Sequence, residues 1–189
     1  MWKILPEKDN PALREIAHEV PLGDIKSARI QKLISEIKTL LAKEEYGVAL
    51  AASQVGEPVR LFIVSGRALL RQAQDKSPRH PKSDYEEDEV PVDLSRTESS
   101  DQVYINPVVL KTSRTKKKKH EGCLSIRGKW GIVPRAEKVM LSAYDEKGEK
   151  CTRGASGFLA HVFQHEMDHL EGILYTDKAT ELYDDKPEQ

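Results

Sequence analysis

Two histidines four residues apart form the most chemically informative pattern in this 189-residue chain, in the sequence Gln-His-Glu-Met-Asp-His that ends at His169. In a helix, residues four apart share one face, so the imidazoles of His165 and His169 can bind one metal ion. The pattern HExxH also places Glu166 beside the open coordination position, where a carboxylate can carry protons. The alternative is an ordinary helix with two surface histidines.

The residues before this motif favour a buried helix. We expect Ser156 to cap its start and Gly172 to end it. Its apolar face consists of Phe158, Leu159, Val162 and Phe163.

A catalytic metal needs a third protein ligand, and the residues after the motif do not supply one. The extended zinc-protease pattern HExxHxxGxxH matches at Gly172, but Tyr175 stands at the position of its last histidine. The only glutamates beyond Glu171 are Glu181 and Glu188, close to the end of the sequence. The third ligand must therefore come from an earlier segment.

The best earlier candidate is the thiol of Cys123, in the segment Glu-Gly-Cys-Leu-Ser at 121–125. Cys151, the only other cysteine, falls in a predicted hairpin strand, where a small buried apolar residue is the expected role. Gly122 allows close approach of the backbone to a site. One cysteine and two histidines leave a position for water, as in catalytic metal sites. Spacing by itself leaves this role and an ordinary thiol equally open.

A third segment, at 46–56, is rich in small residues and contains one amide side chain, Gln54. An amide N–H can stabilise a developing oxyanion. Taken in isolation, the segment favours the other interpretation, a glycine and alanine turn packed against a helix.

Together the three segments resemble the peptide deformylase family, whose motifs GxGxAAxQ, EGCLS and QHExDH occur in this order. Here they read GVALAASQ, EGCLS and QHEMDH, and the one departure is Ala49, where the family has glycine. Shorter matches occur at 4–5, 11–14, 105–107 and 133–139. The resemblance covers the chain apart from a segment at about 67–102.

The resemblance implies hydrolysis of the formyl group from the N-terminal methionine of new polypeptides, with release of formate. It implies one divalent metal ion per chain, ferrous iron in the cell with zinc, nickel or cobalt in preparations, held by Cys123, His165 and His169. Glu166 would transfer the water proton. The side chain of Gln54 and the backbone N–H of Leu124 would stabilise the oxyanion.

The same resemblance implies how the peptide binds. Its backbone would pair with Gly47, Val48 and Ala49 as an extended strand, and Glu121 and Gly122 would also contact it. The methionine pocket would be lined or bordered by Val48, Phe158, His161 and Val162. His161 lies one turn before His165, and we interpret it as the rim of this pocket and not as a ligand.

Two other functions remain open from the sequence. One is a metallopeptidase built on the same helix, which the missing third histidine disfavours. The other is a ribosome-binding or peptide-binding relative without activity, which the complete set of ligands and Glu166 disfavours.

Composition limits the partners and the compartment. A net charge of -1 predicts no bulk attraction to nucleic acid and no specific DNA binding, although a transient ribosome contact is compatible with it. Two cysteines are too few for a disulfide framework, and no apolar stretch is long enough to span a membrane. We therefore expect a cytoplasmic protein. The lysine run at 116–119, the acidic run at 86–89 and the acidic tail around 184–185 are predicted to be solvated loops.

The elements expected to position these residues form one α+β domain over 1–189. Apolar residues at helical spacing predict an N-terminal amphipathic helix at about 25–43. Strands are expected at 59–64 and at 103–110, where Pro107 indicates an edge or a bulge, and a hairpin at 139–151. Antiparallel or mixed strands would surround a central metal-binding helix that carries HExxH. The segment at 67–102 is predicted to be a charged, mobile insert.

Overall fold

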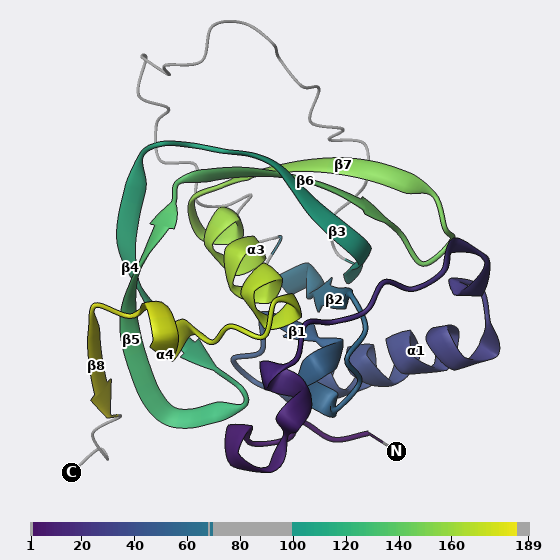
Figure 1. The fold of residues 1–189 in the computed structure, drawn as a ribbon, viewed down its shortest axis with the longest axis horizontal. Coiled ribbons are helices and arrows are strands. Elements are labelled where there is room, and N and C mark those ends of the chain that lie inside the picture. Colours follow the sequence, from purple (N-terminus) through teal and green to yellow (C-terminus); the bar gives the residue numbers. More distant parts are fainter. Residues whose placement is uncertain (1, 68, 70–99, 185–189) are drawn as a thin grey trace, which may run out of the picture.

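The computed structural model describes residues 2–67, 69 and 100–184, so most of the segment predicted to be an insert lies outside the described residues. Two antiparallel sheets surround the helix that carries HExxH, which confirms the α+β class (Figure 1). The five-stranded sheet has the order β1-β2-β3-β6-β7, and the three-stranded sheet has the order β4-β5-β8.

The strands are β1 (Ala49–Ala51), β2 (Leu61–Val64), β3 (Gln102–Thr112), β4 (Lys116–Cys123), β5 (Ile126–Ala136), β6 (Lys138–Tyr144), β7 (Lys150–Ser156) and β8 (Glu181–Asp184). The α-helices with described bounds are α1 (Ala28–Lys43), α3 (Gly157–Leu170) and α4 (Tyr175–Lys178). Short 3₁₀ helices are η1 (Glu7–Asp9), η2 (Pro11–Arg14), η3 (Leu22–Asp24) and η4 (Ala52–Val55). None of the helices in the described part of the chain is long and apolar enough to cross a membrane.

Helix α1 begins three residues later than its apolar pattern suggested. Residues 22–24 form η3, and the Oγ atom of Ser27 then accepts a hydrogen bond from the N–H of Ile30 at 3.4 Å, which caps the helix. One face is buried against the β1-β2 end of the five-stranded sheet, and its buried residues are Ile30, Leu33, Ile34, Ile37 and Leu41.

Strand β3 contains the predicted irregularity at Pro107. Because β3 lies between β2 and β6, the proline is at a bulge and not at a sheet edge, and the register shifts between Ile105 and Val108. Asn106 takes a positive φ of 49° there, and its side chain bonds the N–H and the carbonyl of Val20 at 2.8 and 2.7 Å.

The lysine run at 116–119 was predicted to be a loop, and this prediction is wrong. These residues form most of β4, which pairs with β5 from Lys116↔Ala136 to Cys123↔Ile126. The acidic tail was also predicted to be a loop, yet residue 184 pairs with Lys129 as the last residue of β8. Exposed charges are common on edge strands, because they prevent pairing with other chains, so charge does not exclude strand structure.

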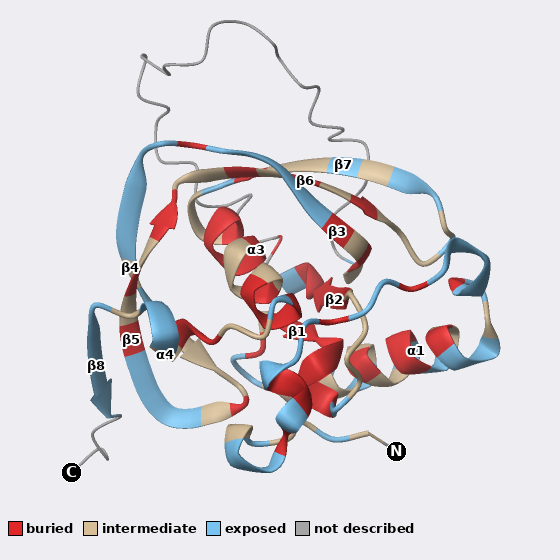
Figure 2. Cartoon of the chain, in the orientation of Figure 1, coloured by how far each residue is buried: buried red, intermediate tan, exposed pale blue. Residues whose placement is uncertain are grey.

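Helix α3 lies in the interior of the molecule (Figures 1 and 2). It packs against the aromatic pair Phe62 and Tyr104 through Phe163, with ring centroids 6.0 and 5.1 Å away. Ser156 precedes the helix as predicted, but its side chain makes no capping hydrogen bond. The tight packing of α3 holds the HExxH side chains in a fixed orientation.

Candidate active site

The residues predicted to bind metal meet between α3 and the end of β4. The ligand atoms of Cys123, His165 and His169 all lie within 4.8 Å of one another. The Cys123 Sγ atom is 3.3 Å from the Nε2 atom of His169, and the two imidazole rings are nearly perpendicular, with centroids 4.8 Å apart. His169 is buried, and Cys123 and His165 are half-buried. Cys123, the third candidate ligand, thus lies beside α3 although it precedes His165 by 42 residues in the sequence (165 − 123).

A buried carboxylate orients His165. The Nδ1 atom of His165 is 2.8 Å from Glu121 Oε2, which leaves Nε2 as the nitrogen available to a metal. Glu121 was predicted to contact substrate, but its side chain is buried and is engaged inside the protein. Burial opposes the charged form of Glu121, but hydrogen bonds from His161, His165 and Arg135 hold its pKa well below its usual range.

Arg135 is the functional residue that the sequence analysis missed. Its Nε and Nη2 atoms donate to the two carboxylate oxygens of Glu121 at 2.7 and 3.0 Å. Its Nη1 atom donates to Asp168 Oδ2 at 2.5 Å, and Lys178 donates to the other oxygen of Asp168 at 2.6 Å. The signal was present in the sequence, because an arginine in an otherwise apolar strand segment must find buried partners.

Glu166, the glutamate of the HExxH motif, is 3% exposed. Its Oε2 atom is buried and has no hydrogen-bond partner among the residues that the structure describes. Burial raises the pKa of Glu166 to about 7, with the charge of His165 acting in the opposite direction. Such a carboxylate can both accept and return a proton near neutral pH.

Gln54 lies next to the cysteine and also stabilises its own turn. Its Oε1 atom accepts from the N–H of Ala51, the residue just before η4, at 2.9 Å. Its Nε2 atom lies 3.4 Å from both Cys123 Sγ and Ser125 Oγ. Gln54 therefore has contacts that support both interpretations, the oxyanion donor and the residue that packs its own turn. Leu124 follows Cys123 directly, in the turn between β4 and β5.

The predicted peptide-binding segment leads into the outer strand of the five-stranded sheet. Ala49 begins β1, is 8% exposed and pairs with Val64 of β2. Gly47 is buried against Glu44 and Leu41, where a Cβ atom would come within 2.8 and 3.0 Å of their side chains. The methyl group of Ala49, which the glycine of the family motif lacks, is accommodated inside the sheet.

The residues predicted for the methionine pocket are on α3 or next to it. Val48 and Phe158 are half-buried and pack against the core cluster that contains Val162. His161 is buried, and its Nε2 atom lies 2.5 Å from Glu121 Oε1. His161 therefore contacts the carboxylate that orients His165.

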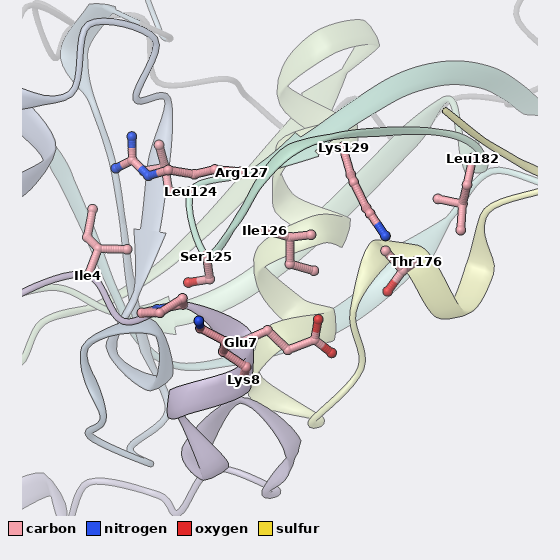
Figure 3. Close-up of a pocket in the computed structure, with 11 residues that line it drawn as sticks. Ile4, Glu7, Lys8, Leu124, Ser125, Ile126, Arg127, Lys129, Thr176 and Leu182 are labelled. Atoms are coloured by element: carbon pink, nitrogen blue, oxygen red, sulfur yellow. The ribbon is translucent and has the colours of Figure 1, made fainter. Parts of the chain in front are cut away.

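A hollow of about 670 Å³ is lined in part by the turn between β4 and β5 (Figure 3). Its walls include Ile4 and Lys8 from the N-terminal segment, Leu124 from the turn, and Lys129 and Leu182 from β5 and β8. None of the three candidate metal ligands lines it.

Comparison with known proteins identifies the family of this chain. The family model described as polypeptide deformylase matches residues 2–185. This chain belongs to the polypeptide deformylase family. It is 36% identical over 177 residues to the chloroplastic/mitochondrial peptide deformylase 1A of Arabidopsis thaliana, covering 92% of this chain and 61% of that protein. It is 34% identical over 170 residues to peptide deformylase 2 of a Nostoc strain, covering 90% and 82% of the two chains.

Solved deformylase structures share the fold. The Synechococcus elongatus peptide deformylase, crystallised in complex with actinonin, superposes with a TM-score of 0.70 at 28% identity and covers 95% of this chain and 79% of its own. The Thermotoga maritima enzyme gives a TM-score of 0.71 at 25% identity, with 96% and 99% covered. The chain spans 61% and 56% of the length of the Arabidopsis and tomato deformylases.

Proposed function

We propose that this chain is a metal-dependent hydrolase that removes the N-formyl group from the N-terminal methionine of new polypeptides and releases formate. The single observation that carries this proposal is the meeting of Cys123, His165 and His169 beside the buried carboxylate of Glu166. Family membership supports the same reaction.

The three side chains fit a divalent transition metal. One thiolate and two imidazoles form a three-ligand set that leaves a position open, and Glu121 gives His165 the tautomer required for binding through Nε2. We expect ferrous iron in the cell, with zinc, nickel or cobalt in preparations. When bound, such an ion lowers the pKa of a water molecule and polarises the formyl oxygen.

The protein's own groups would carry the proton and stabilise the developing charge. Glu166 accepts the proton of the attacking water and delivers it to the leaving nitrogen, which its pKa of about 7 suits. The Nε2–H of Gln54 and the N–H of Leu124 donate to the oxyanion. Gln54 Nε2 points toward Cys123 Sγ, which supports this role.

Two sheet edges would hold the peptide. In the described strands, β1 pairs only with β2 and β4 pairs only with β5, so each leaves one edge available to an extended chain. The peptide would pair with Gly47, Val48 and Ala49 on one side and contact Gly122 on the other. Its methionine would enter a pocket bordered by Val48, Phe158 and Val162.

The same proposal covers the partners and the domain. The substrate would be the formylated N-terminus of nascent chains, with a transient ribosome contact, in the compartment where such chains are made. We propose that residues 1–189 form one catalytic domain.

The competing metallopeptidase function has less support. Tyr175, at the position of the third histidine of that class, donates its hydroxyl to the carbonyl of Lys129 at 2.9 Å and stacks on His165, with centroids 6.1 Å apart. Its ring therefore packs on the face of the His165 imidazole.

The deciding experiment measures formate and new amines from formyl-Met-Ala-Ser and from Met-Ala-Ser, with metal added back to the purified chain. We expect formate from the first peptide and no cleavage of the second. Glu166→Gln should abolish formate release from the first peptide. Cleavage of the internal peptide bonds, or no formate at any metal loading, would contradict the proposal.

A further inference from the structure

The outer face of the three-stranded sheet, away from α3, carries aromatic side chains that remain in contact with solvent. Glu121 on β4 faces α3, because its carboxylate lies 2.8 Å from His165 Nδ1. Neighbouring residues of a strand point to opposite faces, so His120 points away from α3. Trp130 on β5 does the same, because a Cβ atom on the adjacent Gly131 would come within 3.1 Å of α4. His120 and Trp130 are both exposed.

Three rings form a cluster on this outer face. Tyr183 on β8 is the register partner of Trp130, and the two residues are 40% and 38% exposed. His120 reaches across β5, where its Nδ1 atom contacts the hydroxyl of Tyr183 and the two rings meet edge to face, with centroids 5.8 Å apart. The six-membered ring of Trp130 packs on the backbone of Gly122, where an added Cβ atom would come within 3.2–3.3 Å of it. Contacts within the sheet therefore hold the rings in place while part of each residue stays exposed.

The lysine run of β4 supplies positive charge beside this cluster, on a strand that is exposed over most of its length (Figure 2). Lys118 and Lys116 lie two and four residues before His120, so strand alternation places them on the same face of the strand. Both are exposed, and neither has an acidic partner among the residues that the structure describes. Lys117, which lies between them, is instead paired with Glu137 at 2.5 Å. Two lysine charges of the outer face are therefore available to an anion.

Negative charge on this face lies at the far side of the sheet. Glu181 on β8 is the register partner of Ile132, which is two residues from Trp130 and shares its orientation. The positive charges are on β4, so β5 separates the two. The whole chain has a net charge of -1, so attraction of a polyanion must be local to the lysine strand. A polyanion bound here would therefore follow β4, with the aromatic cluster beside it.

We propose that this outer face binds single-stranded RNA, with phosphates at Lys116 and Lys118 and unpaired bases on the rings of Trp130 and Tyr183. Lysines two residues apart on a strand are about 7 Å apart, a spacing that an extended sugar-phosphate backbone can match. The inference goes beyond the proposed hydrolysis and does not depend on it, because none of these residues is a candidate metal ligand or proton carrier.

The combination of charges and rings identifies this partner. Every base has a flat aromatic face, so exposed rings can stack on single strands of any sequence while lysines bind the backbone. In an RNA duplex the bases are stacked and paired with each other, which leaves mainly the phosphates accessible to this surface. An acidic polypeptide would use the lysines and would gain little from the rings. Single-stranded RNA uses both.

The first test titrates the full chain into a labelled oligouridine of about 12 nucleotides, within the range of about 4–16 occupied by sequence-independent binders, and follows fluorescence anisotropy. Two phosphate contacts predict a slope of about -1.4 when the logarithm of the binding constant is plotted against that of the salt concentration. The double substitution Lys116→Gln and Lys118→Gln should bring this slope close to zero and weaken binding. The matched control is Lys32→Gln with Lys43→Gln, which removes the same charge from exposed positions of α1 and should leave both quantities unchanged.

The second test separates stacking from charge. Tyr183→Leu should weaken binding by about 5–100-fold, the range measured when one stacking ring is removed, and should keep the salt slope. Tyr183→Phe retains the ring and should bind like the wild type. Leu182→Ala is the control, because this exposed neighbour on β8 points to the other face, toward Gly131. In a Trp2→Phe variant, which leaves Trp130 as the one indole, bound RNA should quench the fluorescence.

Three results would overturn the inference. One is binding of an RNA duplex or of polyglutamate as tight as that of the single strand, because charge alone would then explain it. The others are unchanged affinity in the double lysine variant and unchanged affinity in folded Tyr183→Leu. Formate release from a short formyl-Met peptide should be the same in the double lysine variant and the wild type, so failure of the proposed function and failure of RNA binding are seen in separate assays.

Discussion

Replacing Arg135 by methionine tests the link between the buried ion-pair network and the metal site. Arg135 and Glu121 have side chains only 4% and 3% exposed, and the arginine donates to both oxygens of the glutamate. Methionine keeps much of the apolar volume but leaves the carboxylate of Glu121 without its cation. Removing one partner of a buried pair costs about 3–5 kcal/mol. Asp168 still has Lys178, so most of this cost arises at Glu121.

Arg135→Met should lower the metal affinity of the site as well as the free energy of unfolding. Without Arg135, Glu121 is less firmly held against His165 Nδ1, and loss of such supporting contacts typically lowers metal affinity by about 10–100-fold. Because hydrogen bonds lower the pKa of Glu121, its contribution to stability is complete above its unfolded pKa and declines as the pH falls below that value. The variant should therefore lose less stability on acidification than the wild type.

The assay is urea unfolding of the metal-free chain together with zinc competition against a chelator. Arg14→Met is the matched control, because Arg14 bonds Glu7 and Asp177 with a side chain 45% exposed. Pairs this exposed are worth about 0–1 kcal/mol. Adding Glu121→Gln to Arg135→Met should restore part of the stability. If Arg135→Met unfolds within about 1 kcal/mol of the control and keeps its zinc affinity, the reasoning about a buried network is refuted.

Three further predictions address the ligands, the proton carrier and the oxyanion donor, and a fourth the insert. Cys123→Ala should lose most of its bound metal, because thiolate bonding is strong; stoichiometric metal in the purified variant would exclude the thiol as a ligand. Glu166→Gln should keep its metal and lose roughly 10²–10⁴-fold in turnover; metal loss instead would make it a ligand. Gln54→Ala should lower kcat by roughly 10²–10³-fold with little change in KM. It should also lower the melting temperature, because Gln54 Oε1 accepts from Ala51, and unchanged kcat per folded molecule would leave only that role. Replacing 70–99 with a short glycine and serine link should preserve formate release, whereas a wider deletion would remove Leu69, which is fully buried, and Asp101, which bonds Gly66.

Local order in this protein could be predicted from local sequence. The spacing of His165 and His169 requires only a helix, and a helix fixes which side chains share a face. The apolar pattern of α1 and the bulge at Pro107 are also consequences of neighbouring residues. The three short motifs are local patterns too, and their resemblance to a known family allowed the reaction to be predicted from the sequence.

Only the tertiary structure decided which distant residues act together. The lysine run became β4 because pairing with β5 satisfies its backbone, a contact that charge pattern does not report. Likewise, Arg135 reaches Glu121 across the β4-β5 pair and Asp168 on α3, and Gln54 reaches Cys123 from η4. These contacts depend on how sheets pack around a helix, and packing is a property of the whole chain. The sequence by itself therefore determined the chemical groups of the site, and the fold determined the network that orients them.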